Sequence, residues 1–315
     1  MYPRLHALLK FAASVITAIA LFGSATVAAA ANDGSSDRPL RVVLIPADGG
    51  TEDGTRKDFE PIFNAVSEAT GLAFELKVGQ SYGAVVEAMC NGSADIAWFG
   101  PVSYLQAHEL GCANLLAMAV SKGKSVYYSG IFAHVDSGID SIADIRGKRI
   151  ALGDINSTSS FNIPVAMMLR AGVDPAKDTA KVNMAGSHAN VLSALSQGLV
   201  DAGGASFDSY EKALNSGAIN GKDIKVVAKS APLPYPPLAI QPGVSADIKA
   251  RLQDAFDSVH TMPSIKPEQI RGYGGKQVDR YTSDVSEETM AEVGDMLNAV
   301  NRDVKQSILT ASNTR

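Results

Sequence analysis

The sequence has few of the residues that build metal or catalytic centres. Its 315 residues include five histidines, two cysteines and one tryptophan. The histidines are scattered, and one of them lies in the N-terminal segment, so they do not predict a metal site. The motifs of serine hydrolases, P-loop nucleotide-binding proteins, HExxH metalloproteases and CxxC oxidoreductases are absent from the sequence. We therefore expect a protein that is not an enzyme and has no metal and no cofactor.

Apolar runs long enough to span a membrane are also lacking. The N-terminal apolar run, residues 11–22, is shorter than the roughly 20 residues that a transmembrane helix needs. It follows Arg4 and Lys10 and precedes small residues at 28–31, which together predict a cleaved signal peptide over residues 1–31. An uncleaved membrane anchor is the alternative. No cysteine lies near the cleavage region, which disfavours a lipid anchor, so we expect export to the periplasm.

Positive charge is scarce, with 28 Lys and Arg against 33 Asp and Glu. Removal of the signal peptide takes away two basic residues and no acidic one, which makes the mature chain more acidic still. This balance argues against nucleic acid or an anionic membrane surface as a partner. An anionic ligand must therefore be held by local donors and dipoles, because the overall field repels it.

The two cysteines, Cys90 and Cys112, lie at the ends of neighbouring predicted elements. In an oxidising compartment an even number of cysteines favours a disulfide. Two buried thiols, or a thiol ligand for a soft element such as As(III), are the alternatives. The sequence therefore predicts a structural disulfide and leaves the alternatives open.

Hydrophobic patterning predicts an α/β protein with two lobes. Strands are expected at 40–45, 72–78 and 94–98, with helices at 59–70 and 82–90 between them. A second series has strands at 150–152, 181–185, 200–202 and 224–229 and helices at 163–171, 188–197 and 210–215. The segments 126–134 and 232–237 are expected to cross between the lobes. We predict lobe I over residues 32–130 and 235–315 and lobe II over residues 131–234, each a mainly parallel sheet flanked by helices.

A run of hydroxyl side chains, Ser157-Thr158-Ser159-Ser160, links an expected strand to an expected helix. Backbone N–H groups at a helix start lack internal partners, and the helix dipole adds partial positive charge there. With hydroxyl donors added, such a turn suits a phosphate-like anion. Ser and Thr are also ordinary helix caps, but four consecutive hydroxyls exceed what capping requires.

Two other polar side chains, His188 and Asp208, follow expected strands at the start of expected helices. The imidazole N–H of His188 can donate to an oxyanion. A carboxylate is useful in an anion site only if it accepts a proton, so Asp208 would favour a monoprotonated ligand. A surface or capping role for His188 and a capping role for Asp208 are the alternatives.

The opposite wall of the expected cleft has Tyr82, which begins a helix and offers a phenol donor. Phe99 ends a buried strand just before Gly100, and Ser103 starts the next helix. Because glycine permits close backbone approach, the amides near Ser103 are expected to face the cleft. Aromatic side chains at such places more often belong to the core, and Phe99 fits either role.

Four segments together resemble the phosphate-, phosphite- and phosphonate-binding components of ABC uptake systems, a group of type II periplasmic binding proteins. They are residues 95–104 (DIAWFGPVSY), 157–159 (STS), 186–188 (GSH) and 201–204 (DAGG). Their order and approximate spacing match, and the resemblance covers residues 40–311. It implies a phosphorus oxyanion held between the lobes by the hydroxyl turn and His188, with further contacts from Tyr82, Phe99 and Asp208.

The chain departs from the members of this family that bind aminoalkylphosphonates. The resemblance implies that those proteins carry Tyr where this chain has Phe99, Glu where it has Asp208, and Asp where it has Pro236. The losses at Phe99 and Pro236 remove polar groups that an amine needs. These losses favour phosphite, methylphosphonate, hypophosphite or phosphate as the ligand. Which of these the site prefers depends on whether Phe99, Tyr82 or Tyr235 presents an apolar wall or a donor to it.

The sequence thus predicts a monomeric periplasmic solute-binding protein that delivers a small oxyanion to ABC permease subunits in the inner membrane. One alternative is an oxyanion sensor, for phosphorus or arsenic, that signals to a membrane histidine kinase. A phosphatase-like enzyme is a further alternative, but the sequence lacks an activated nucleophile and a metal cluster.

Overall fold

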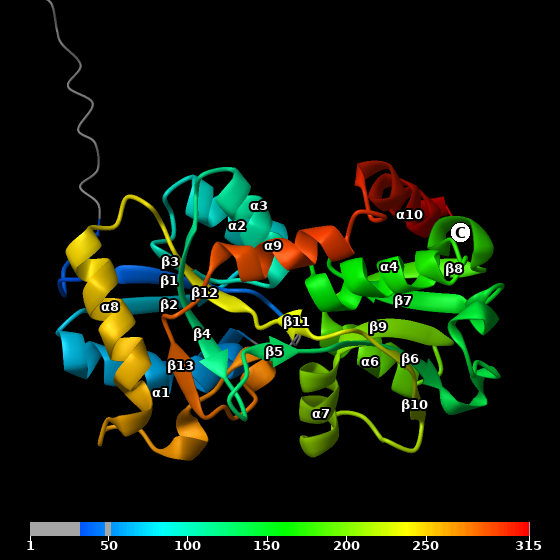
Figure 1. The fold of residues 1–315 in the computed structure, drawn as a ribbon. Coiled ribbons are helices and arrows are strands. Elements are labelled where there is room, and N and C mark those ends of the chain that lie inside the picture. The colour runs from blue at the N-terminus through cyan, green and yellow to red at the C-terminus, as the bar shows by residue number, and fades with distance from the viewer. Residues whose placement is uncertain (1–31, 48–51, 315) are drawn as a thin grey trace, which may run out of the picture. The chain divides into compact units, whose positions relative to one another are not determined.

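The computed structural model describes residues 32–47 and 52–314. The predicted signal peptide, residues 1–31, lies outside these described residues. Among them, no helix is both long enough and apolar enough to cross a membrane. The described residues form a six-stranded and a five-stranded sheet with helices packed against them, and a small two-stranded sheet (Figure 1).

The first sheet, called sheet I here, has six strands in the order β13-β4-β12-β3-β1-β2. Its strands are β1 (Leu40–Leu44), β2 (Phe74–Val78), β3 (Ile96–Trp98), β4 (Asn114–Val120), β12 (Pro237–Ile240) and β13 (Arg280–Thr282). The helices of this part are α1 (Glu52–Thr70), α2 (Tyr82–Cys90), α3 (Pro101–Glu109), α8 (Ala246–Ser258) and α9 (Glu287–Met296). Aromatic rings contribute to its core, where Trp98 packs between Phe59 and Tyr281.

The second sheet, called sheet II here, has five strands in the order β10-β6-β9-β7-β8. Its strands are β6 (Ser129–His134), β7 (Arg149–Gly153), β8 (Lys181–Gly186), β9 (Ala202–Ser206) and β10 (Ile224–Lys229). Its helices are α4 (Ile163–Arg170), α5 (Pro175–Asp178), α6 (His188–Ser196), α7 (Phe207–Asn215) and α10 (Arg302–Thr314). Short strands β5 (Val126–Tyr127) and β11 (Leu233–Pro234) pair antiparallel where the chain passes between the sheets.

The α/β class is as predicted, but both sheets are mixed rather than mainly parallel. In sheet I, β1 pairs parallel with β2 and β3, whereas β12 is antiparallel to β3 and β4. In sheet II, β7 pairs parallel with β8 and β9, whereas β6 is antiparallel to β9 and β10. The strands β6 and β12 each enter a sheet from the other one, so no helical crossover within the sheet constrains their direction.

The C-terminal helix also differs from the predicted lobe boundaries. Residues 235–315 were expected in lobe I, but α10 packs against α5 and β8 of sheet II. Its apolar residues Ile308 and Ala311 share a buried cluster with Ile150 and Val182. The amphipathic pattern of α10 predicts a buried face but cannot say which sheet covers it.

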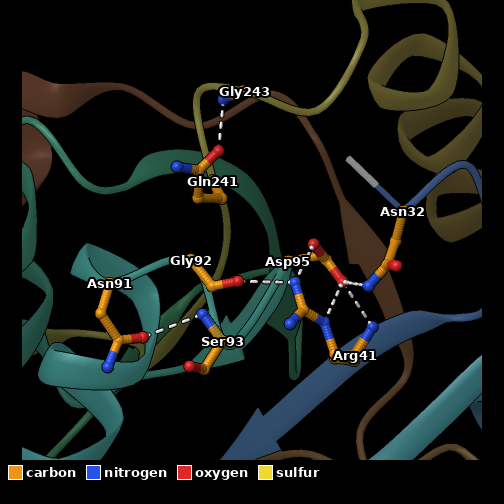
Figure 2. Close-up of polar contacts among 8 residues, drawn as sticks. All are labelled: Asn32, Arg41, Asn91, Gly92, Ser93, Asp95, Gln241 and Gly243. Atoms are coloured by element: carbon orange, nitrogen blue, oxygen red, sulfur yellow. Dashed lines mark hydrogen bonds and ion pairs between the residues drawn. The ribbon is translucent and has the colours of Figure 1, made fainter. Parts of the chain in front are cut away.

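An Arg–Asp clamp ties the start of β1 to the turn before β3. Arg41 donates to the carboxylate of Asp95 from its backbone N, Nε and Nη2 at 2.8, 3.0 and 2.9 Å. Its Nη2 also donates to the carbonyl of Gly92, and Asn32 donates to Asp95 (Figure 2). Burial opposes ionisation of Asp95, but these donors keep its pKa below the ordinary value. The clamp therefore holds the start of β1 against the start of β3 in sheet I.

Sheet II repeats the same clamp with the same atoms. Arg149, in β7, donates to Asp201 from its backbone N, Nε and Nη2 at 2.7, 3.1 and 2.7 Å. Both clamps hold the first strand of a βαβ unit against the turn before its neighbouring parallel strand. The two halves of the fold thus share the same Arg–Asp hydrogen-bonding pattern, although their sequences show no evident repeat.

We expect Asp95→Ala to lower the free energy of unfolding by about 2 kcal/mol and Asp201→Ala by about 1 kcal/mol. Asp95 is more deeply buried, with 8% of its side chain exposed against 20% for Asp201. After removal of Asp95, water can therefore replace the lost hydrogen bonds of Arg41 less well than it can replace those of Arg149 after removal of Asp201. Urea unfolding of the two variants measures the difference, and equal losses would contradict the assigned role of burial.

The predicted disulfide is confirmed. Cys90, the last residue of α2, is bonded to Cys112, which lies between α3 and β4. The two residues are 22 positions apart in the sequence. The bond therefore holds together two neighbouring helices that border the predicted binding site.

Candidate functional site

Four helical segments that border the site start at serine caps. Ser81, Ser157, Ser187 and Ser206 each accept a hydrogen bond from a backbone N–H three residues later. Each serine ends or follows a strand, so the caps lie where helix N-termini gather. This regular arrangement places four sets of partly positive helix starts around one region.

In the hydroxyl turn, residues 157–160, some side chains cap the turn itself and others are available to the site. Ser157 accepts hydrogen bonds from the backbone N and the Oγ of Ser160 at 3.2 and 2.7 Å, so Ser157 and Ser160 stabilise the turn itself. The next residues form a π-helical turn, Thr158–Asn162, a geometry common at functional sites. Gly153 is required behind the turn because a Cβ there would collide with Ser160. The turn therefore needs neither Thr158 nor Ser159 as its cap.

Thr158 and Ser159 contact elements on both sides of the site. Thr158 Oγ1 accepts a hydrogen bond from the backbone N of Val102, in the first turn of α3, at 2.9 Å. The hydroxyl of Tyr127 interacts with the side chains of Thr158 and Ser159. Burial raises the pKa of Tyr127 strongly, so its phenol stays protonated and remains a donor. The predicted hydroxyl turn is thus buried between sheet II and the start of α3.

His188 is oriented by a backbone donor. Its Nδ1 accepts a hydrogen bond from the backbone N of Ser206 at 3.0 Å. A neutral imidazole with Nδ1 as acceptor carries its proton on Nε2. Nε2 lies 2.7 Å from the hydroxyl of Tyr273 and 3.4 Å from Ser157 Oγ. His188 therefore presents an N–H donor toward the hydroxyl groups of the site.

Tyr273 completes this hydrogen-bonded group and was missed by the sequence analysis. Its hydroxyl lies 3.5 Å from that of Tyr82 and its ring packs against Tyr127 at 5.6 Å between centroids. Tyr273 lies in a Tyr-Gly-Gly segment in which both glycines adopt positive φ. An aromatic residue followed by two glycines in a polar stretch is the signal that could have drawn attention to it.

Sheet II loops and sheet I helices are joined at two further points. Asp154 accepts from the backbone N of Tyr82 at 3.2 Å, and Gln106 donates to Asn156 at 3.0 Å. Burial raises the pKa of Asp154, although the backbone donors of Asn156 and Tyr82 oppose that shift. Together with Thr158, these residues connect the hydroxyl turn region to the N-terminal ends of α2 and α3.

Asp208 is buried at the start of α7 and paired with a cation that the sequence analysis did not single out. Its Oδ1 lies 2.9 Å from Lys276 Nζ, and the same ammonium lies 3.0 Å from Glu211 Oε2. Burial lowers the pKa of Lys276, but the two carboxylates outweigh it and raise the pKa above its ordinary value. A cavity of about 610 Å³ lies beside the pair, lined by Asp208, Glu211 and Lys276 among others.

The remaining predicted site residues are buried but contact other groups. Phe99 packs edge-on against Tyr104 in the core of sheet I, with centroids 6.4 Å apart. Ser103 Oγ accepts from the backbone N of Gly100 and donates to its carbonyl. Tyr235 packs edge-on against Tyr127 at 6.1 Å. The structure therefore brings Tyr82, Ser157, Thr158, Ser159 and His188 together, whereas Tyr235 packs on Tyr127 and Asp208 pairs with Lys276.

The donor set suits an anion. It consists of serine, threonine and tyrosine hydroxyls, the Nε2–H of His188 and a helix start, all of which can donate to oxygen. Within residues 32–47 and 52–314, no group of three or more His, Cys, Asp or Glu side chains could hold a metal ion. The geometry thus supports recognition of a small oxyanion by hydrogen bonds.

Comparison with known proteins gives a consistent result. A family model for the periplasmic substrate-binding protein of phosphonate ABC transporters matches residues 50–274. The phosphonates-binding periplasmic protein of Escherichia coli (strain K12) is 24% identical over 262 residues, covering 81% of this chain and 77% of that protein. The phosphate-import protein PhnD of Mycolicibacterium smegmatis (strain ATCC 700084 / mc(2)155) is 26% identical over 240 residues, covering 73% and 74%.

A solved structure is similar over most of the chain. It is PhnD1 from Prochlorococcus marinus (MIT 9301) in complex with methylphosphonate, with a TM-score of 0.71 and 17% identity. The alignment covers 84% of this chain and 98% of that one. At this identity the likeness concerns the fold.

Proposed function

The chain belongs to the family of periplasmic substrate-binding proteins of phosphonate ABC transporters, and from that premise we propose that it captures a small phosphorus oxyanion without an amine. The predicted type II periplasmic binding fold is confirmed by its structural likeness to a family member. Its relatives are binding components of transporters rather than enzymes. The proposal concerns the ligand class, the residues that hold it and the place where it is bound.

The observation that carries the proposal is the orientation of His188. The Ser206 N–H occupies Nδ1, so Nε2–H is the donor that faces Ser157 and Tyr273. An oxyanion among these groups would accept from Nε2 and from Ser159 and Thr158 in the hydroxyl turn. Neutral donors in a buried site bind an anion without a full opposite charge.

The absence of an amine in the ligand is supported by two positions. Phe99 packs in the core of sheet I, so it adds no polar group to the site. Pro236 offers no side-chain acceptor. Phosphite, methylphosphonate and phosphate fit this requirement. One relative is named for phosphate import, and one neighbour was solved with methylphosphonate, which supports ligands of this size.

The wider role follows from the family. We propose that the signal peptide over residues 1–31 is cleaved during export, and that the mature protein works as a periplasmic monomer. Ligand contacts to both sheets would stabilise the closed form that ABC permease subunits recognise. Neither nucleic acid nor catalysis enters this role. The Cys90–Cys112 disulfide fits an oxidising compartment and includes both cysteines of the sequence, which leaves no thiol for As(III).

A thermal-shift screen of the purified mature protein tests the proposal. Phosphite, methylphosphonate, phosphate and hypophosphite form the test set, with arsenite and sulfate as comparison anions. A ligand at 100 times its Kd should stabilise the protein by about 2.7 kcal/mol, seen as a higher Tm. Stabilisation by at least one phosphorus oxyanion and not by sulfate is expected. Stabilisation by arsenite alone, or by none of the phosphorus compounds, would contradict the proposal.

A further inference from the structure

Asp208 and Lys276 form an ion pair that joins sheet II to sheet I beside the hydrogen-bonded group around His188. Asp208 lies in α7, after β9 of sheet II, and Lys276 lies in the segment before β13 of sheet I. Only 7% of the Asp208 side chain is exposed, against 36% for Lys276. A carboxylate buried to this degree requires a nearby cation or several donors. Lys276 supplies such a cation from the other sheet.

The pair lies next to the oxyanion site along both of its chain segments. Ser206, two residues before Asp208, donates to His188, and Tyr273, three residues before Lys276, contacts the same imidazole. Asp208 also contributes, after burial, to raising the pKa of Tyr127, whose hydroxyl interacts with Ser159. Asp208 and Lys276 therefore border the residues that we assign to the oxyanion.

The cavity beside the pair has room for such a substituent. Its volume is about 610 Å³, and charged residues of both signs line it: Asp58, Asp208, Glu211, Lys212, Arg271 and Lys276. Lys212 is paired with Asp58 at 2.9 Å, so this second lysine is held by a carboxylate other than Asp208. The cavity itself is thus large enough for a short cationic chain, which would meet charged groups of both signs there.

We propose that Lys276 is a specificity-determining residue whose ammonium group takes the place beside Asp208 that the cationic group of a ligand would need. A ligand ammonium near Asp208 would meet the like charge of Lys276, which costs binding energy. Without Lys276, the buried carboxylate would attract a ligand cation instead. The inference rests on the proposed function, because it assumes that the ligand is a phosphorus oxyanion held near Ser159.

Calorimetric titration of Lys276→Gln with 2-aminoethylphosphonate and methylphosphonate tests the inference. The wild type should prefer methylphosphonate. In the variant, the ratio of the affinity for 2-aminoethylphosphonate to that for methylphosphonate should rise by about tenfold, the effect of one charge-assisted contact. Lys276→Arg keeps the cation, so it should keep the preference of the wild type.

Lys212→Gln is the matched control, because it removes a lysine from the same cavity and leaves Asp208 paired. It should not change the ratio. The double variant Lys276→Gln/Asp208→Asn should lose the gain, because the carboxylate that attracts the amine is gone. An unchanged ratio in Lys276→Gln, or an equal rise in Lys212→Gln, would overturn the inference while methylphosphonate binding by the wild type still supports the proposed function. A wild type that binds no phosphorus oxyanion would overturn both.

Discussion

The Ser159→Ala/His188→Ala double variant should bind its best phosphorus oxyanion at least about 100-fold more weakly than the wild type. A hydrogen bond to a charged group contributes about 1.5–3 kcal/mol, and the double variant removes two such donors. Each single variant should lose roughly 1.5–3 kcal/mol of binding free energy. We expect this loss because we propose that Nε2 of His188 and Oγ of Ser159 donate hydrogen bonds directly to the oxygens of the ligand.

Isothermal titration calorimetry of the four proteins measures these losses. His134→Ala is a suitable control, since His134 ends β6 and its Nδ1 caps the turn at Asp136. That variant should retain the affinity of the wild type. Because His188 also accepts from Ser206, thermal unfolding without ligand is needed to show that the variants remain folded. Unchanged affinity in folded His188→Ala would contradict the assignment of His188 as a ligand donor.

The Cys90→Ala/Cys112→Ala variant should lose about 3 kcal/mol of unfolding free energy relative to the oxidised wild type. The bond closes a loop between residues 22 positions apart, and a cross-link of this length mainly restricts the unfolded chain. The loss should be largely independent of ligand, because the bond lies between α2 and α3 rather than among the site residues.

Guanidinium unfolding with and without a thiol reductant measures this effect. Reductant should destabilise the wild type to about the level of the variant and leave the variant unchanged. Equal unfolding free energies for the oxidised wild type and the variant would contradict the stabilising role. A large loss of ligand affinity in the folded variant would show instead that the bond positions the start of α2.

Local patterns were sufficient to predict which residues lie together in much of the candidate site. Ser157, Thr158, Ser159 and His188 each follow a strand at a helix start, a position that is visible in the sequence. The disulfide was predicted from compartment and cysteine number. Only the hydrogen bonds of the folded turn showed that Ser157 caps it, which leaves Thr158 and Ser159 as the proposed ligand donors.

Tyr273 and Lys276 could not be predicted in the same way. Tyr273 is 85 positions from His188 and Lys276 is 68 positions from Asp208, so only the folded chain brings them together. Neither residue follows a strand, and the segment around them is held by turns. Long-range pairing of this kind leaves no periodic pattern in the sequence, as the placement of α10 on sheet II also illustrates.

Phe99 and Asp208, two of the three positions at which the chain departs from the aminoalkylphosphonate binders, were informative for different reasons. Phe99 was expected either in the core or at the ligand, and the structure packs it with Tyr104. Asp208 was expected to accept a proton from the ligand, whereas the structure pairs it with Lys276. Tyr273 contacts both Tyr82 and His188, so we propose that these phenol groups, rather than Phe99, distinguish phosphite from phosphate.

A crystal structure of the mature protein grown with methylphosphonate tests the central claim most directly. The phosphonate oxygens should lie within about 3 Å of Ser159 Oγ and His188 Nε2, the distance of a hydrogen bond to a charged acceptor. The methyl group should face Tyr82 or Tyr273. Phosphonate bound in the cavity beside Lys276, with the hydroxyl turn and His188 making no contact with it, would contradict the account.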